Sequence, residues 1–271
     1  MKMLLSFFFA LLVLATPMGL GGAVAMDLSQ SDARSDAAAA PVLIELFTSE
    51  GCSSCPPADA LLTKLDGTHL PGVQPIVLSE HVDYWNHDGW KDAYSSSFFT
   101  ERQQEYVRRL GAKEPYTPQM VIDGAAQMNG SDGVAVARAL ETARSHVKIP
   151  VRISSAALAD AKTIRVHLAV DALPADFKAR KADIFIAVAL GHAESHVSAG
   201  ENKGRDIRHV AVVESISKVG TVEKGKNFDR DVLVKVKGPL DAGNLRVIAF
   251  AQEEDAGEVV GASLFGSTIT N

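Results

Sequence analysis

Two cysteines separated by two residues lie where a predicted buried strand turns into a predicted helix. Residues 42–47 form a nearly unbroken apolar run, and Pro57 opens a segment with helical spacing, since proline is favoured at the start of a helix. Unpaired N–H groups and the positive end of the helix dipole favour a thiolate at such a turn. We therefore predict that Cys52 caps the helix and attacks a partner disulfide. Cys55, one turn further and less exposed, then resolves the mixed disulfide.

These two residues are the only cysteines in the sequence. A bridge across so short a span constrains the unfolded chain little, so a purely stabilising role is physically weak. The chain is also long enough to build its own core without a disulfide framework. We expect a redox-active disulfide between Cys52 and Cys55.

The first 25 residues have the pattern of a cleaved export signal. Lys2 supplies a positive start, residues 4–13 are apolar, and Ala23-Val24-Ala25 gives the small-x-small cleavage pattern. The apolar run is shorter than the roughly 20 residues that span a bilayer. We predict a signal peptide over residues 1–25, a periplasmic or secreted protein, and no stable membrane span after cleavage. The alternative is an uncleaved anchor, which also leaves the folded part outside the cytoplasm.

The rest of the chain divides into three parts by composition. Residues 26–40 are rich in Ser, Asp and Ala and are predicted to be a flexible linker. Residues 41–148 alternate strand, helix, strand, helix, strand, strand and helix, which predicts an α/β domain. Residues 149–271 contain short strands separated by turn glycines, which predicts a β-sandwich-like domain. The seven strands expected there span residues 151–153, 163–170, 183–190, 210–216, 232–236, 245–252 and 259–265.

Several motifs resemble a secreted bacterial thioredoxin-like family of unknown function. They are ELFTSEGCSSCPPAD at 45–59, HVDYW at 81–85, GWKD at 89–92, YTPQM at 116–120 and GENKGR at 200–205, followed by His209. The resemblance implies a thioredoxin-like fold for residues 41–148. It also implies a cis bond between Thr117 and Pro118 beside the cysteines, with the Thr117 backbone free to pair with a substrate chain.

Three polar residues are further candidates for the site: His81 and Asp83 at the end of one predicted strand, and Glu45 inside another. His81 and Asp83 are two apart, so on a strand they share a face, and that strand ends beside the one that precedes the cysteines. They form either a polar wall near the thiols, as proton acceptor or metal ligand, or an anchor for the aromatic segment 84–90. Glu45 is either a buried carboxylate that takes the proton of Cys55 or a solvent-facing residue at a sheet edge.

The combined features predict an exported thiol–disulfide oxidoreductase-like protein that acts on protein or small thiol and disulfide substrates. Two rival hypotheses are a copper metallochaperone that uses Cys52, Cys55 and His81, and a redox-inactive scaffold with a structural bridge. The net charge of −6 argues against a nucleic-acid partner. Neither a cofactor nor a resident metal ion is predicted.

Overall fold

The computed structural model of the chain describes residues 39–236, 241–266 and 269. The predicted signal peptide, residues 1–25, and the predicted linker up to residue 38 lie outside the described residues. Among the helices of the described part, none is long and apolar enough to cross a membrane.

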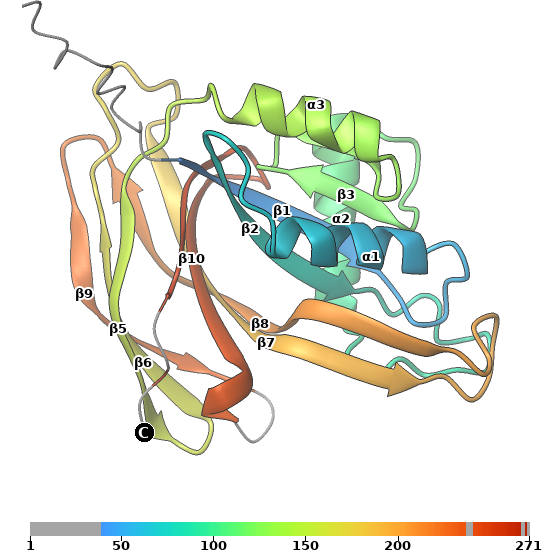
Figure 1. The fold of residues 1–271 in the computed structure, drawn as a ribbon. Helices are drawn as coiled ribbons and strands as arrows, with labels where there is room; N and C mark the ends of the chain where they lie inside the picture. Colours follow the sequence, from blue (N-terminus) through green and yellow to red (C-terminus); the bar gives the residue numbers. More distant parts are fainter. Residues whose placement is uncertain (1–38, 237–240, 267–268, 270–271) are drawn as a thin grey trace, which may run out of the picture. The chain divides into compact units, whose positions relative to one another are not determined.

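Strands and helices alternate in the first part of the described chain, in the predicted order (Figure 1). The elements are β1 (Ala40–Thr48), α1 (Pro56–Asp66), β2 (Val73–His81), α2 (Ser97–Leu110), β3 (Gln119–Ile122), β4 (Ala126–Asn129) and α3 (Gly133–Ala143). Local chemistry sets the helix ends. Ser96 caps α2 by accepting a hydrogen bond from the Phe98 N–H, and Gly111 ends this helix in the left-handed region at φ 70°. Asp132 caps α3.

Strands dominate the remaining part of the chain. They are β5 (Val151–Asp160), β6 (Thr163–Val170), β7 (Lys181–His196), β8 (Asp206–Glu223), β9 (Phe228–Lys235), β10 (Leu245–Glu253) and β11 (Val259–Leu264), with a short 3₁₀ helix at Ala242–Asn244. Each of the seven predicted strands is present. β7 and β8 are much longer than expected, because alternating polar residues extend them beyond their apolar centres.

One mixed sheet contains strands from both halves of the chain. Its order is β11-β10-β7-β8-β2-β1-β3-β4, and a second sheet has the order β5-β6-β9. β1 and β2 are parallel, and β8 joins β2 in parallel where Ser79 lies opposite Val212. The long β7–β8 hairpin thereby continues the sheet past β2 and runs beside α1 (Figure 1).

The predicted fold class is therefore wrong. We expected an α/β thioredoxin-like domain followed by a separate all-β sandwich-like domain, whereas the described chain is mostly β, with three α-helices and an eight-stranded mixed sheet. The apolar runs located the strands, but a local pattern does not determine which strands pair. The boundary predicted between residues 148 and 149 falls between α3 and β5, and the division into domains there stays a prediction.

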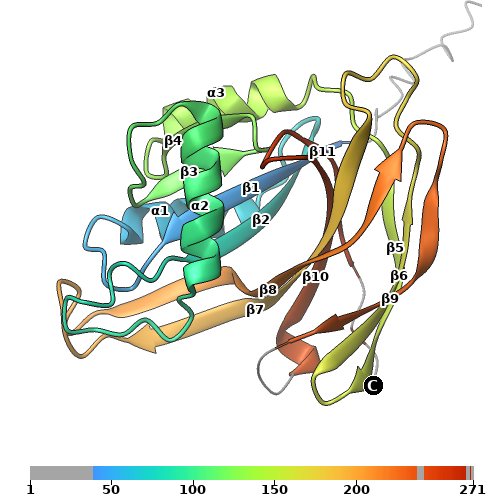
Figure 2. The ribbon, with the colours of Figure 1, turned by 180° about the vertical axis from the view of Figure 1, so that it is seen from behind.

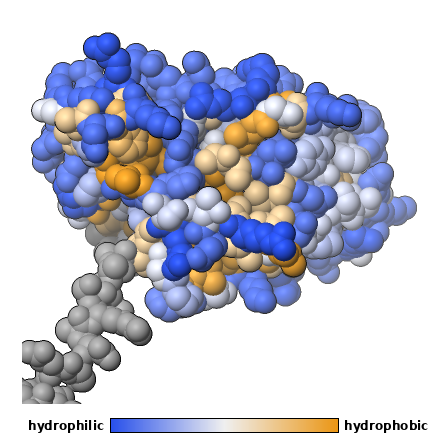
Figure 3. All heavy atoms as spheres, turned by 90° about the horizontal axis from the view of Figure 1, so that it is seen from above, coloured by the Kyte–Doolittle hydropathy of each residue, from blue (hydrophilic) through white to orange (hydrophobic). Residues whose placement is uncertain are grey.

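Helices cover both faces of the sheet around β1. Val42, Ile44 and Leu46 point to the face where α1 and α3 pack, whereas Leu43 and Phe47 point to the face covered by α2, which is seen from behind in Figure 2. The three-stranded sheet packs on the β7 and β10 end through a second apolar core. Figure 3 looks down on the side of α3 and shows apolar patches within a largely hydrophilic surface.

A buried aspartate after β3 makes the stability of the fold depend on pH. Asp123 accepts a hydrogen bond from the Leu43 N–H at 2.9 Å and pairs with Lys148 at 2.8 Å. Burial nevertheless raises the pKa of Asp123 to about 6. Because the pKa is higher in the folded state, the stabilising contribution is present at low pH and is lost as the pH rises through the folded pKa.

We expect the wild-type protein to lose about 3 kcal/mol of unfolding free energy, relative to Asp123→Asn, as the pH rises from about 3 to about 8. Urea unfolding at a series of pH values measures this difference. Parallel pH profiles for the two proteins would contradict the raised pKa of Asp123.

Candidate functional site

The two cysteines form a disulfide immediately before α1. Cys52 and Cys55 are bonded, with their Cα atoms 5.4 Å apart, so the predicted disulfide is confirmed. Cys55, rather than Cys52, is the N-cap of α1, which corrects the predicted cap. The physical reason is that Pro56 and Pro57 occupy the first helical turn without N–H groups, and the Cys55 carbonyl accepts the first hydrogen bonds, from Ala58 and Asp59.

The segment between the cysteines faces solvent, whereas both cysteines are fully buried. The Ser54 hydroxyl lies 3.4 Å from the Cys52 sulfur and 3.5 Å from the Thr117 carbonyl oxygen. The bond between Thr117 and Pro118 is cis, as predicted. The Trp85 indole N–H donates to the Thr117 hydroxyl at 2.7 Å. The structure thus brings Thr117 to the cysteine turn.

Glu45 lies on the face of β1 opposite α1. Arg102 of α2 donates to its carboxylate at 2.7 Å, and the Tyr106 hydroxyl donates at 2.5 Å. Glu80 of β2 lies 3.7 Å from the same guanidinium. Burial, together with the charge of Glu45, raises the pKa of Glu80 well above its usual value. Glu45 is buried, as one hypothesis expected, but the structure does not bring it together with the cysteines.

His81 and Asp83 are held by different elements. His81 Nδ1 lies 2.7 Å from the Asp92 carboxylate, whereas Asp83 accepts from the Thr100 hydroxyl of α2 at 2.7 Å. The expectation that they share a face fails because β2 ends at His81. Burial alone would lower the pKa of His81, but Asp92, and more weakly Asp59 and Glu50, outweigh it and raise that pKa.

A buried polar cluster beneath α1 was missed by the sequence analysis. Asp59 of α1 is 3.4 Å from Nδ1 of His209 on β8, and the Thr48 hydroxyl donates to Asp59 at 3.3 Å. The rings of His81 and His209 meet edge to face, with centroids 4.6 Å apart. Asp59 and His209 lie in motifs that carried the family resemblance, which was the available signal.

Most of this chain matches one known protein family. A family model described as "Protein of unknown function (DUF1223)" matches residues 43–252. The chain belongs to the DUF1223 family. The prediction of a family of unknown function is thereby confirmed, and the match carries no statement about a thioredoxin-like fold or secretion. No curated protein matches the sequence.

Two solved structures share the fold of this DUF1223 chain. A crystal structure of the protein AGR_C_4864 from Agrobacterium tumefaciens has a TM-score of 0.62 and 27% sequence identity, covering 85% of this chain and 94% of the other. HBP35 of Porphyromonas gingivalis has a TM-score of 0.60 at 14% identity, covering 85% and 75% of the two chains. The second likeness shows the fold alone.

Within the described residues, no group of three or more His, Cys, Asp or Glu side chains is arranged to hold a metal ion. His81, a ligand in the copper hypothesis, uses Nδ1 to bind Asp92. No observation therefore favours the copper hypothesis over the redox one.

A segment between β7 and β8, residues 197–205, covers the cysteine turn, and we call it the capping segment. The Asn202 side-chain amide donates to the carbonyls of Glu50 and Cys52, both at 2.9 Å. Glu201 accepts from the Ser53 N–H at 3.1 Å. Because Asn202 is itself fully buried, these contacts help to close the disulfide from solvent.

We expect Asn202→Ala to expose the disulfide. Losing two hydrogen bonds of about 1 kcal/mol each favours opening by about 2 kcal/mol, which is roughly a thirtyfold faster reduction by dithiothreitol. Alkylation and mass spectrometry of samples taken over time measure the rate. Lys203→Ala, at the exposed neighbouring position, is the matched control. Equal rates in all three proteins would show that the capping segment does not guard the disulfide.

Proposed function

We propose that this protein is an exported thiol–disulfide oxidoreductase that exchanges disulfides with protein or small-molecule thiols. The observation that carries the proposal is the Cys52–Cys55 disulfide, which closes a turn of two intervening residues in front of α1. Such a short loop constrains the unfolded chain little. A reactive role therefore accounts for the bridge better than a stabilising one.

In the reduced protein we assign the attack on substrate to Cys52. The Ser54 hydroxyl lies 3.4 Å from its sulfur and can turn its proton from the Thr117 carbonyl to this sulfur, which favours a thiolate. The thiolate forms a mixed disulfide with the substrate, and Cys55 then attacks Cys52 and releases the substrate as a thiol. We assign the resolving role to Cys55, which is bonded to Cys52 in the oxidised protein and whose backbone is anchored at the start of α1.

Substrate docking is proposed at Thr117, beside the exposed serines. The Thr117 carbonyl lies 3.5 Å from the Ser54 hydroxyl, so a chain that pairs with this backbone lies along the cysteine turn. Backbone pairing positions a substrate without selecting its side chains. This arrangement suits an enzyme that acts on many different disulfides.

Export fits this chemistry. Disulfides persist in the periplasm and outside the cell, whereas cytosolic thiols are kept reduced. The signal pattern in residues 1–25 supports a location where the pair meets both thiols and disulfides.

Reduction of insulin by dithiothreitol tests the proposal. We expect catalytic amounts of the protein to accelerate the precipitation of insulin B chain, and a Cys52→Ser/Cys55→Ser double variant to have no effect. If the wild-type protein is also inert, although mass spectrometry shows its cysteines reduced, the scaffold hypothesis replaces the proposed function.

A further inference from the structure

Asp59 and His209 form a buried polar pair whose environment calls for an explanation. They are 4% and 2% exposed, and Asp59 Oδ1 lies 3.4 Å from His209 Nδ1 without the geometry of a hydrogen bond. Among the described residues, neither ring nitrogen of His209 has a hydrogen-bond partner. Asp59 Oδ2 accepts from the Thr48 hydroxyl, but burying Asp59 Oδ1 and both His209 ring nitrogens without partners costs free energy, so the pair serves packing poorly.

Asp59 lies one helical turn beyond the resolving cysteine. Cys55 has helical backbone angles, and the Asp59 N–H donates to its carbonyl at 3.1 Å. Side chains four residues apart on a helix share a face, with Cβ atoms about 5–6 Å apart. A carboxylate at Asp59 can therefore take a proton from the Cys55 sulfur directly or through one water.

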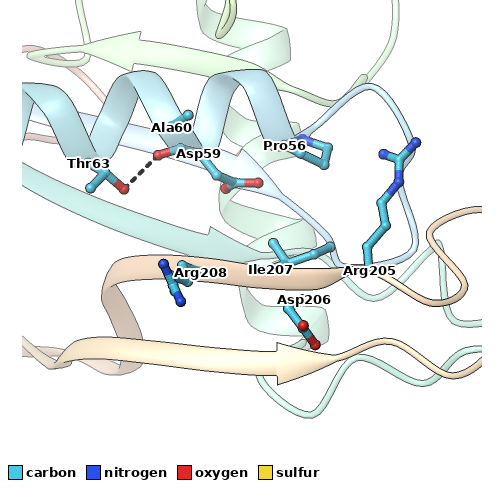
Figure 4. A pocket seen from close by; sticks show the side chains of 8 residues that line it. All are labelled: Pro56, Asp59, Ala60, Thr63, Arg205, Asp206, Ile207 and Arg208. Atoms are coloured by element: carbon cyan, nitrogen blue, oxygen red, sulfur yellow. Dashed lines mark hydrogen bonds between the residues drawn. The ribbon is translucent and has the colours of Figure 1, made fainter.

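Asp59 also borders a route to solvent. A pocket of about 510 Å³ lies between α1 and β8, and Figure 4 shows the Asp59 side chain pointing from α1 toward β8. The residues that line the pocket are Pro56, Asp59, Ala60, Thr63, Arg205, Asp206, Ile207 and Arg208. A proton held at Asp59 can leave through this pocket.

The charged groups around the pair come from several elements. β8 supplies His209 and its chain neighbour Arg208, and Arg205 immediately precedes this strand. Both arginines line the pocket. The His209 ring contacts the ring of His81 on β2. Nδ1 of His81 in turn lies 2.7 Å from the Asp92 carboxylate. The other titratable groups near His81 are Glu50 and Tyr94.

We propose that Asp59, which lies beside His209, accepts the proton of the Cys55 thiol when Cys55 resolves the mixed disulfide. This inference rests on the proposed function. Cys55 loses its proton to Asp59, its sulfur bonds to Cys52, and the bond between Cys52 and the substrate sulfur breaks. The electron pair leaves with the substrate thiolate, and the Asp59 proton passes to solvent. His209 belongs to β8, so residues 149–271 complete the redox centre.

A disulfide reagent that releases two coloured thiolates, dithiobis(nitrobenzoate), separates the steps. Attack by Cys52 of the reduced protein releases the first thiolate, and resolution by Cys55 releases the second. We expect Asp59→Asn to slow the second release at least roughly tenfold at pH 7. The difference in this rate between Asp59→Asn and the wild-type protein should disappear above about pH 9, where a thiol ionises without a general base. His209→Gln should give a smaller effect with the same pH dependence.

In Asp59→Asn and His209→Gln, the rate of the first release is expected to differ from that of the wild-type protein by less than about twofold. In Asp66→Asn, the rate of the second release is also expected to change by less than about twofold. Asp66 is the matched control because it lies at the far end of α1, paired with Arg246. If Asp59→Asn slows the second release equally at every pH, or does not slow it at all, the proposed role of Asp59 is overturned. If near-ultraviolet circular dichroism shows that Asp59→Asn is not folded, the pH profile of the second release in His209→Gln tests the proposal instead. Absence of the first release in the wild-type protein would instead overturn the proposed function.

Discussion

Replacing Cys52 with serine is expected to abolish disulfide exchange, lowering insulin reduction by on the order of 100-fold or more. Replacing Cys55 with serine is expected to leave the first attack intact, because Cys52 keeps its sulfur and its neighbour Ser54. Without a resolving thiol, the mixed disulfide accumulates. Mass spectrometry of non-reduced samples measures the trapped substrate on Cys52.

Ser53→Ala is the control for this experiment, because the residue lies between the cysteines and is exposed. It should retain insulin reduction and form no trapped complex. The opposite pattern, with substrate trapped on Cys55 in Cys52→Ser and none on Cys52 in Cys55→Ser, would reverse the two assigned roles.

Arg102→Met is expected to give the largest loss of stability, about 3–5 kcal/mol of unfolding free energy. Arg102 is buried between α2 and the sheet, where it pairs with Glu45 at 2.6 Å and lies 3.7 Å from Glu80. It also donates to Gln252 of β10 at 3.1 Å. Removing the guanidinium leaves the buried carboxylate of Glu45 without its charge partner. Urea unfolding of the purified variant measures the loss.

Arg108→Met is the matched control, since it makes the same change at an exposed position of α2. It should alter the unfolding free energy by no more than about 0.5 kcal/mol. The double variant Glu45→Gln/Arg102→Met removes both charges and should recover part of the loss. An unchanged midpoint for Arg102→Met would show that the buried pair contributes nothing to stability.

Local features of the fold could be predicted from the sequence. Pro57, placed after an apolar run and the cysteine turn, located the start of α1. Strand pairing could not be predicted in this way. Nothing local to residues 210–216 indicates that β8 pairs with β2, and this pairing joins the parts that the sequence analysis separated. Partner choice depends on packing across the whole chain, and a local apolar pattern does not contain it.

The candidate site shows the same limit. The cysteines and the cis Pro118 were predicted, because motif and resemblance specify them. Glu45 is buried, as one of its two hypotheses expected, and alternation along β1 turns it toward Arg102. His209 is 150 residues or more from the cysteines in sequence and reaches Asp59 only through the pairing of β8. Buried polar pairs of this kind depend on tertiary contacts.

The reduction potential of the Cys52–Cys55 pair tests the central claim most directly. Equilibration in redox buffers of graded potential, followed by alkylation and mass spectrometry, gives the fraction reduced at each potential. The account predicts a midpoint between about −270 and −120 mV, the range of proteins that catalyse disulfide exchange. A midpoint below about −300 mV, typical of structural bridges, would contradict it.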